Sequence, residues 1–194
     1  MTNRFYTFVG GSSGPWRVSD IRTIAGHGIE AVSHVEIVNE DLQQTPPNAT
    51  WALRGVVSNQ RYTTRSELDS LKAVQPPLGR HEAMYAVLIP LAKSAAWWEL
   101  AQDERREIIE ARSAHIATGL RYLPAVARRL HHSRDIGEPF DFVTWFEFAP
   151  QDTSAFYELV TKLRKTDEWR YVEREVEIRL TLDQQSKRDA QHDR

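Results

Sequence analysis

The feature that most constrains the fold is an uninterrupted apolar run at residues 83–89, followed at once by Pro90. The run reads Ala-Met-Tyr-Ala-Val-Leu-Ile and carries no charge, so a strand formed by it would be apolar on both faces. Such a strand belongs at the centre of a sheet that is covered on both sides. Because proline lacks the N–H that a ladder needs, we expect regular pairing to end at Pro90.

Four shorter strands and one helix are expected before this run. β-Branched and aromatic residues gather in four segments, at residues 4–9, 16–24, 34–38 and 51–58. Glycine-rich residues 10–14 join the first two, which are therefore predicted to form a hairpin. Residues 39–48 are polar and predict a loop. Leucines at helical spacing predict a helix over 64–74, with Thr63 or Thr64 as its cap.

The elements after the run alternate between strands and helices. They are predicted as a helix at 94–100, a helix at 103–123, a short strand near Leu130, a strand at 141–148, a helix at 153–165 and a strand at 169–182. Pro124 would break or kink the chain after the long helix. This order resembles the split βαβ unit of ferredoxin-like folds.

We therefore predict an α+β fold built from two ferredoxin-like halves. The N-terminal half, residues 1–80, is a shortened counterpart of the C-terminal half, residues 81–182. Residues 183–194 are polar and are expected to be a disordered tail.

Composition removes several classes of function. A formal net charge of −2 gives no electrostatic footprint for nucleic acid or for an anionic membrane. The chain has no cysteine, so disulfides and thiolate chemistry are excluded. The apolar runs are too short to cross a bilayer, and the start of the chain lacks the pattern of an export signal. We expect a cytoplasmic protein without nucleic-acid or membrane partners.

His115 is the first candidate site residue. On its predicted helix it shares a face with small side chains, including Ala111, Thr118 and Gly119, which would leave room for a flat macrocycle. A neutral imidazole is a common metal ligand, and it is one of the axial ligands of haem iron. The alternative is a buried, hydrogen-bonded histidine of the core. Both interpretations stay open on this pattern alone.

Three charged residues could complete a site with His115. The Arg128 guanidinium could hold an oxyanion by two parallel hydrogen bonds, although a surface arginine beside Arg129 is the alternative. Lys93 follows the apolar strand and Glu168 lies at the start of the last one, so the sheet could bring both near His115. A carboxylate on the second ring nitrogen would fix the tautomer of the imidazole. The alternative is two ordinary surface charges.

Other candidates are aromatic or polar. Trp97 and Trp98 are adjacent and cannot share one helix face, so one could wall a cavity while the other packs in the core. Gln75 could gate a pocket from its loop, or could be a solvated side chain. Further histidines that could ligate a metal are His81, His131 and His132, but adjacent residues on a strand point to opposite faces.

Four motifs, in this order, resemble the chlorite dismutase family. They are Thr50-Trp-Ala-Leu-Arg-Gly-Val56, Lys93-Ser-Ala-Ala-Trp-Trp98, the stretch from His115 to Arg128, and Arg134-Asp-Ile-Gly-Glu-Pro-Phe-Asp-Phe142. The resemblance covers roughly residues 4–182 and is closest to the short, dimeric branch of that family. It implies a fold of the dimeric α/β-barrel type that binds haem b in the C-terminal half.

The resemblance also implies residue roles. His115 would be the proximal iron ligand, with Glu168 and Lys93 behind it. Arg128 would be the flexible cation on the opposite side of the haem, and Gln75 the residue that can hold it. The remaining residues implied to lie beside the haem or its propionates are Trp97, Trp98, Tyr62 and Arg61.

The activity implied by the resemblance is conversion of chlorite to chloride and dioxygen, with formation of an O–O bond while Arg128 confines hypochlorite. The implied partner is this small anion, and the implied assembly is a homodimer. The short N-terminal half and the missing export signal depart from the larger periplasmic pentamers of the family. Coproheme decarboxylase is an alternative on the same scaffold, but those relatives lack the distal arginine. A non-catalytic haem carrier or sensor is a second alternative.

Overall fold

The computed structural model describes residues 3–57 and 62–183. Eight strands in these ranges form a closed barrel in the order β1-β3-β2-β8-β5-β7-β6-β4, with every pairing antiparallel. The strands are β1 Phe5–Gly11, β2 Trp16–Ala25, β3 His34–Val38, β4 Ala49–Val57, β5 Tyr85–Lys93, β6 Ala127–His132, β7 Phe142–Phe148 and β8 Val172–Leu182.

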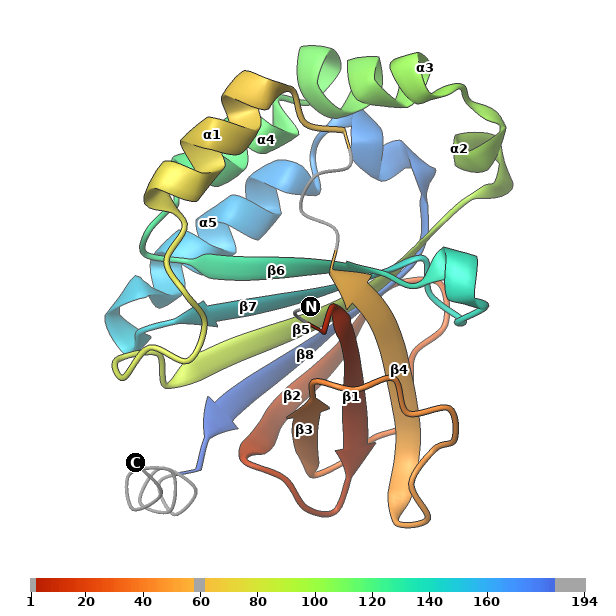
Figure 1. Ribbon diagram of the computed structural model, residues 1–194, viewed down its shortest axis with the longest axis vertical. Helices are drawn as coiled ribbons and strands as arrows, with labels where there is room; N and C mark the ends of the chain where they lie inside the picture. Colours follow the sequence, from red (N-terminus) through yellow and green to blue (C-terminus); the bar gives the residue numbers. More distant parts are fainter. Residues whose placement is uncertain (1–2, 58–61, 184–194) are drawn as a thin grey trace.

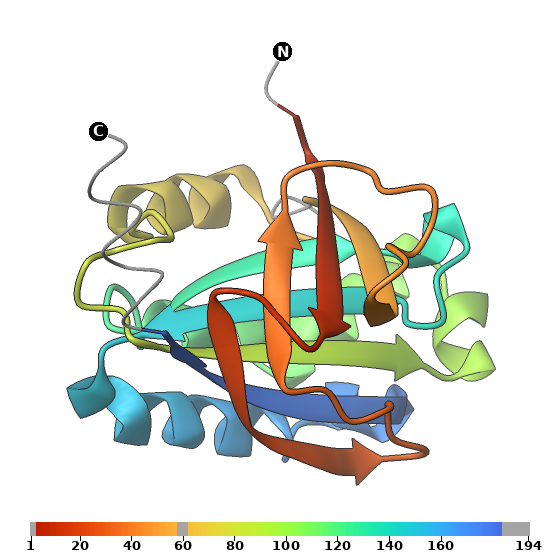
Figure 2. The same ribbon diagram turned by 90° about the horizontal axis from the view of Figure 1, so that it is seen from below.

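The helices gather on one side of strands β5 to β8, and strands β1 to β4 lie on the other side, as Figures 1 and 2 show. The α-helices are α1 Arg65–Val74, α2 Ala95–Glu99, α3 Gln102–Arg106, α4 His115–Leu120 and α5 Thr153–Leu163. A π-helical stretch, Glu107–Arg112, follows α3 directly. Short 3-10 helices span Arg134–Ile136, Pro150–Asp152 and Asp167–Tyr171. The predicted mixture of α and β structure is confirmed.

Strand β5 is buried on both faces, as its apolar sequence predicts. Ala86 and Leu88 belong to the core inside the barrel, whereas Val87 and Ile89 pack in the second core that includes α5. All four side chains are at most 6 % exposed. Sheet β5–β8 therefore separates two packed layers, which is why this run carries no charge.

The prediction that pairing ends at Pro90 is wrong. Strand β5 continues to Lys93, and Pro90 lies opposite Val143 in the ladder with β7. Pairing with β8 resumes at Leu91, which lies opposite Glu175. The neighbouring strands on both sides hold β5 in place across the one missing donor.

The predicted hairpin between the first two strands is also wrong. Strand β3 lies between β1 and β2, and it pairs with both of them. The main partner of β2 is β8, which pairs with it from Trp16 to Ala25. A glycine is needed in the intervening turn, because Gly14 has φ 142° and a Cβ there would lie 2.8 Å from the carbonyl oxygen of Val35.

The helix predicted over 103–123 is interrupted. Regular helix from α3 gives way to the π-helical stretch, and Ala114 then adopts a left-handed conformation with φ 47°. Helix α4 starts at the next residue, His115. The helix over 64–74 is confirmed as α1: Thr64 accepts the N–H of Glu67, whose carboxylate accepts the N–H of Thr64.

Strands from both sides of residue 80 form one closed barrel, so the strand pairings do not mark a boundary between two halves. The predicted boundary at residue 80 therefore stays a prediction. Residues 184–194 of the predicted tail lie outside the described residues. No helix within 3–57 and 62–183 combines the length and the apolar character needed to cross a membrane.

His131 lies on the barrel side of β6. Its ring is edge-on to Tyr6 and Phe8, with centroids 5.3 and 5.0 Å away. Its Nδ1 lies 2.9 Å from the carbonyl oxygen of Val143, to which it donates in the neutral ring. The side chain is 1 % exposed, and this burial lowers the pKa of His131 to about 4. His132 packs instead against Phe142, with ring centroids 4.6 Å apart.

Because the pKa of His131 is below its unfolded value of about 6.5, its contribution to stability is complete above pH 6.5 and is lost as the pH falls towards 4. Lowering the pH from 7.5 to 5 should cost about 2 kcal/mol through this residue. His131→Phe should remove that part of the pH dependence in urea unfolding. The exposed His81, changed to Gln, is the control and should leave the slope unaltered.

Candidate active site

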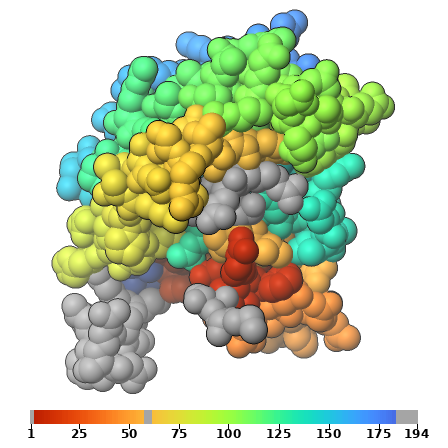
Figure 3. All heavy atoms as spheres, turned by 45° about the horizontal axis from the view of Figure 1, so that its top comes forward, coloured from red at the N-terminus to blue at the C-terminus, as the bar shows by residue number. Residues whose placement is uncertain are grey.

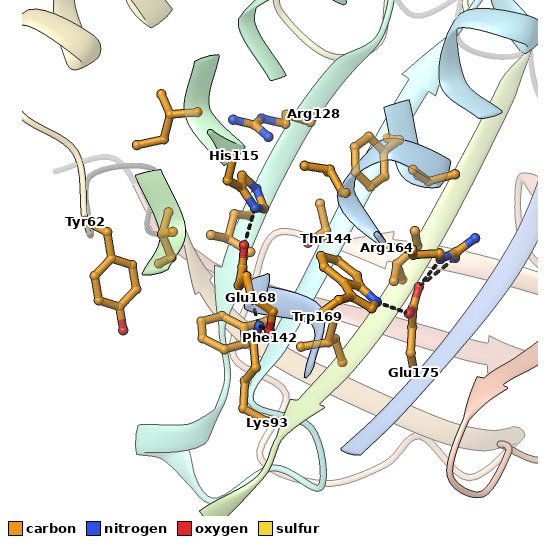
Figure 4. A pocket seen from close by; sticks show the side chains of 18 of the residues that line it. Tyr62, Lys93, His115, Arg128, Phe142, Thr144, Arg164, Glu168, Trp169 and Glu175 are labelled. Carbon is orange, nitrogen blue, oxygen red and sulfur yellow. Dashed lines mark hydrogen bonds and ion pairs between the residues drawn. The ribbon is translucent and has the colours of Figure 1, made fainter. Parts of the chain in front are cut away.

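A large cavity lies between the helices and the face of strands β5 to β8 that is turned away from the barrel (Figure 4). Its volume, including the open mouth, is about 1180 Å³. Its walls are mostly apolar, with side chains such as Ile89, Leu130 and Phe146 from three neighbouring strands. Helix α1 closes one side of the cavity and contacts α4. In Figure 3 the yellow surface of α1 adjoins the green surface of the helical residues that follow α2. A mostly apolar cavity with a few polar groups pointing into it is typical of a ligand or cofactor site.

His115 enters the cavity from the first position of α4. Its Nδ1 lies 2.6 Å from Oε2 of Glu168 (Figure 4). A neutral ring that donates from Nδ1 to this carboxylate has an unprotonated Nε2, the atom that binds metals. Within the described ranges, Nε2 has no hydrogen-bond or ion-pair partner, and the side chain is 24 % exposed. His115 is therefore a partly exposed side chain that lines the cavity, and not a fully buried core residue.

Lys93 and Glu168 form a buried ion pair behind His115. The ammonium lies 2.9 Å from Oε1 of Glu168 and 3.2 Å from its carbonyl oxygen. Burial raises the pKa of Glu168, but the charges of His115 and Lys93 and their hydrogen bonds outweigh it and hold that pKa well below its usual range. The backbone N–H of Glu168 donates to Oγ of Ser113, 3.1 Å away. The carboxylate is therefore fixed and ionised.

Two tryptophans enclose the Lys93 ammonium. It lies 4.7 Å from the ring centre of Trp97 and 5.4 Å from that of Trp169, within the range of a cation–π contact. Trp97 is 1 % exposed and lines the cavity. Trp98 lies away from the cavity lining: it stacks on Phe142 and donates from Nε1 to a carboxylate oxygen of Asp141, 3.1 Å away.

Arg128 projects from β6 into the same cavity (Figure 4). Its guanidinium packs on Gly119 of α4, where an added Cβ would lie 2.9 Å from Nη1. Within the part of the chain that the structure describes, no carboxylate forms an ion pair with it. Burial lowers the pKa of Arg128, and the charge of Glu168 opposes this effect. A guanidinium still keeps its proton at any working pH, so the cavity contains an uncompensated cation.

The predicted Gln75 contacts Arg128, but through the backbone. Its Nε2 donates to the carbonyl oxygen of Arg128 over 2.7 Å. The neighbouring Arg129 faces the opposite side of β6, with its guanidinium 4.7 Å from the ring of Tyr6. Alternation along the strand thus separates the two arginines.

Tyr62 also lines the cavity, and its hydroxyl is buried without a hydrogen-bond partner in the described part of the chain. The carbonyl oxygen of Tyr62 accepts a hydrogen bond from Arg106, which also pairs with Glu67 of α1 at 2.6 Å. Arg106 thus connects α3 to Tyr62 in the cavity wall and to helix α1. The predicted Arg61 lies outside the described residues.

A second polar group in the cavity wall was not among the predicted site residues. Glu175 on β8 is fully buried and accepts hydrogen bonds from Arg164 at 2.6 and 3.0 Å and from Nε1 of Trp169 at 2.8 Å. The alternating charges of β8 were its signal. The apolar positions Val176, Ile178 and Leu180 face the barrel core, and Arg164 at the end of α5 pairs with Glu175 on the other face.

These residues fit a haem-like group. Across 3–57 and 62–183, no cluster of three His, Cys, Asp or Glu side chains could hold a metal ion, so the site offers one imidazole as ligand. A macrocycle that carries its own nitrogen donors needs only such an axial ligand. The apolar walls suit its faces, and the Tyr62 hydroxyl, which has no partner among the described residues, could donate to a peripheral carboxylate.

Comparisons with known proteins agree on one family. The family model described as chlorite dismutase matches residues 30–182. A solved structure, described as a dimeric chlorite dismutase from Nitrobacter winogradskyi, is 53 % identical, with a TM-score of 0.85 over 92 % of this chain and 99 % of that one. A mutant chlorite dismutase from Candidatus Nitrospira defluvii has a TM-score of 0.66 at 19 % identity, over 94 % of this chain and 92 % of its own, and so shares the fold.

A curated chlorite dismutase from Ideonella dechloratans is 36 % identical over 87 residues. The matched segment is 45 % of this chain and spans 28 % of that relative's length.

The contribution of the buried Lys93–Glu168 ion pair to stability can be tested without a cofactor. Glu168→Gln leaves the Lys93 ammonium buried without its counter-charge, which should lower the free energy of unfolding by about 3–5 kcal/mol in urea titration. The double variant Lys93→Met/Glu168→Gln should recover much of that loss, because no buried charge is then unpaired. The exposed pair Glu158–Lys162 supplies the control, since Glu158→Gln should have almost no effect.

Proposed function

The chain belongs to the chlorite dismutase family, and we propose that it is a haem b enzyme that converts chlorite to chloride and dioxygen. The observation that carries the proposal is the content of one apolar cavity: a histidine backed by a buried carboxylate, and an arginine. Among the described residues, Nε2 of this histidine has no partner and the arginine has no ion pair. A single-ligand metal site and a single anion-binding cation are the two groups that this reaction requires of the protein.

In this proposal His115 binds the iron through Nε2. Glu168 accepts the Nδ1 proton, which holds the ring in the tautomer that leaves Nε2 available and makes the imidazole a stronger donor. Lys93 keeps Glu168 ionised and in place. When bound, the haem supplies the redox chemistry that breaks and forms bonds to oxygen.

Arg128 is proposed to hold the anions. Chlorite is a small oxyanion, and a guanidinium can bind it by two parallel hydrogen bonds. The same charge would retain the hypochlorite fragment until the O–O bond forms, since an apolar cavity strengthens the attraction of one cation. Gln75 would limit the movement of this part of β6 by its hydrogen bond to the Arg128 backbone.

Other assignments complete the proposal. Tyr62 would contact a haem propionate and Trp97 would lie near the haem. Arg61 is proposed as a second propionate contact by the family resemblance alone, because it lies outside the described residues. Trp98 lies outside the cavity lining and would act only by packing behind it. Residues 81–182 would form the ferredoxin-like half that holds the haem. We further propose a homodimer, on the similarity to the dimeric structure from Nitrobacter winogradskyi, and a cytoplasmic location.

The iron ligand is tested by His115→Ala. The variant should fold but lose its iron–histidine bond, because the described cavity offers no second imidazole. Titration with haem, followed by the Soret band and by the low-frequency Raman spectrum, measures this. A variant that keeps the parent's spectrum would remove His115 from the site.

The anion role is tested by Arg128→Ala, with Arg129→Ala as the matched control. Loss of one positioned donor for an anionic transition state should lower kcat/KM for chlorite by about 100-fold or more, with haem still bound. The control should keep the parent's rate, because Arg129 lies on the opposite face of β6. An oxygen electrode records turnover, and a chlorination trap detects released hypochlorite. Equal oxygen yields from the two variants would contradict the role.

Two experiments, addition of chlorite to the haem-loaded protein and addition of hydrogen peroxide to the coproheme-loaded protein, separate the alternatives. A haem carrier or sensor would bind haem but evolve no oxygen from chlorite. A decarboxylase would instead remove propionates from coproheme when hydrogen peroxide is added. The presence of Arg128 in the cavity, with no ion pair to any described residue, favours the chlorite reaction over both.

A further inference from the structure

The helix that carries His115 starts without a capping side chain of its own. Its N-cap residue is Ala114, in a left-handed conformation with φ 47° and ψ 38°. The first N–H groups of a helix have no partner within the helix, and Ser, Thr, Asp or Asn usually supplies one. Alanine cannot do so.

Glu110, which lies in the preceding π-helical stretch, supplies the missing capping group. Its Oε2 accepts the N–H of Ile116 at 2.8 Å, and its Oε1 lies 3.3 Å from the N–H of Ala117. Both donors are in the first turn of α4, directly after His115. A carboxylate is also favoured there by the dipole of the helix. One side chain therefore bridges the break between the two helical segments.

The segment between the two helical stretches also contacts Glu168, the hydrogen-bond partner of His115. Ser113, which is 6 % exposed, accepts the backbone N–H of Glu168 through its Oγ. Residues 110–114 thus contact both sides of the His115–Glu168 hydrogen bond: Glu110 fixes the turn that carries the ring, and Ser113 fixes the backbone that carries the carboxylate. The left-handed Ala114 follows Ser113 and directly precedes His115, at the point where α4 starts.

From this geometry we propose that Glu110 is a positioning residue for the iron ligand. It holds the start of α4 so that the His115 ring meets Glu168 and turns Nε2 to the cavity. Glu110 lies outside the cavity lining and acts through the backbone. The inference rests on the proposed function in so far as His115 binds haem iron, but the capping itself does not depend on haem.

The test compares Glu110→Ala and Glu110→Gln in the haem-loaded protein. The alanine variant loses the cap, and haem dissociation into a scavenging apoprotein should be about 10-fold faster, the loss expected when a group that orients a metal ligand is removed. The iron–histidine stretching band of the ferrous protein should shift to lower frequency. The glutamine variant keeps an acceptor oxygen, so it should lie between the parent and Glu110→Ala.

Glu104→Ala is the matched control. Glu104 also accepts a backbone N–H, that of Ala101 at 2.7 Å, but it caps α3 rather than α4. Its loss should leave haem dissociation and the iron–histidine band as in the parent. Glu110→Ala with the parent's dissociation rate and band would overturn the proposal, as would an equal effect of Glu104→Ala.

Amide hydrogen exchange in the haem-free protein separates this inference from the proposed function. Ile116 and Ala117 should exchange faster in Glu110→Ala, whether or not His115 binds iron. Suppose that His115→Ala kept the parent's haem spectrum, while Ile116 and Ala117 still exchanged faster in Glu110→Ala. The proposed function would then fail, but the capping role of Glu110 would stand. If the amides were unaffected in Glu110→Ala, the cap would fail by itself.

Discussion

The site depends on the buried carboxylate of Glu168, which is paired with Lys93 on one oxygen and with His115 on the other. These contacts join the end of β5, the start of α4 and the turn before β8. A carboxylate buried without partners would be costly, so the loss of either partner would destabilise the site. The same pairing makes Nδ1 a donor and leaves Nε2 facing the cavity. One group of contacts thus both stabilises the buried charges and orients the imidazole for its proposed role as a metal ligand.

A second constraint is the double-sided sheet. Because β5 to β8 are covered on both faces, successive residues of one strand serve different regions. On β6, Arg128 and Leu130 line the cavity, whereas Arg129 and His131 face the barrel interior. Strand β7 alternates in the same way, with Thr144 in the cavity wall and Trp145 in the barrel core. A shift of one residue in register would exchange the two sets, so the barrel core fixes which arginine enters the cavity.

The errors of the sequence analysis have a common cause. The hairpin was predicted because two strands are adjacent in sequence, but β2 pairs with β8 over almost its whole length. Pro90 was expected to end a strand, but ladders on both sides hold it. The helix over 103–123 has the right residues for a continuous helix, yet it breaks at Ala114. In each case contacts between distant segments outweighed a local preference. Glu175 was overlooked for the same reason.

The sequence by itself determined the elements whose signals are local: the strand that is apolar on both faces, the capped helix α1, and the motifs that resemble one family and point to His115 and Arg128. Only the tertiary structure decided which of these residues meet. His115 and Glu168 are 53 positions apart, as are Gln75 and Arg128. Periodicity encodes which face of an element is buried, but the register of a closed barrel fixes the distance between elements. That register depends on all the strand pairings together, so no single segment contains it.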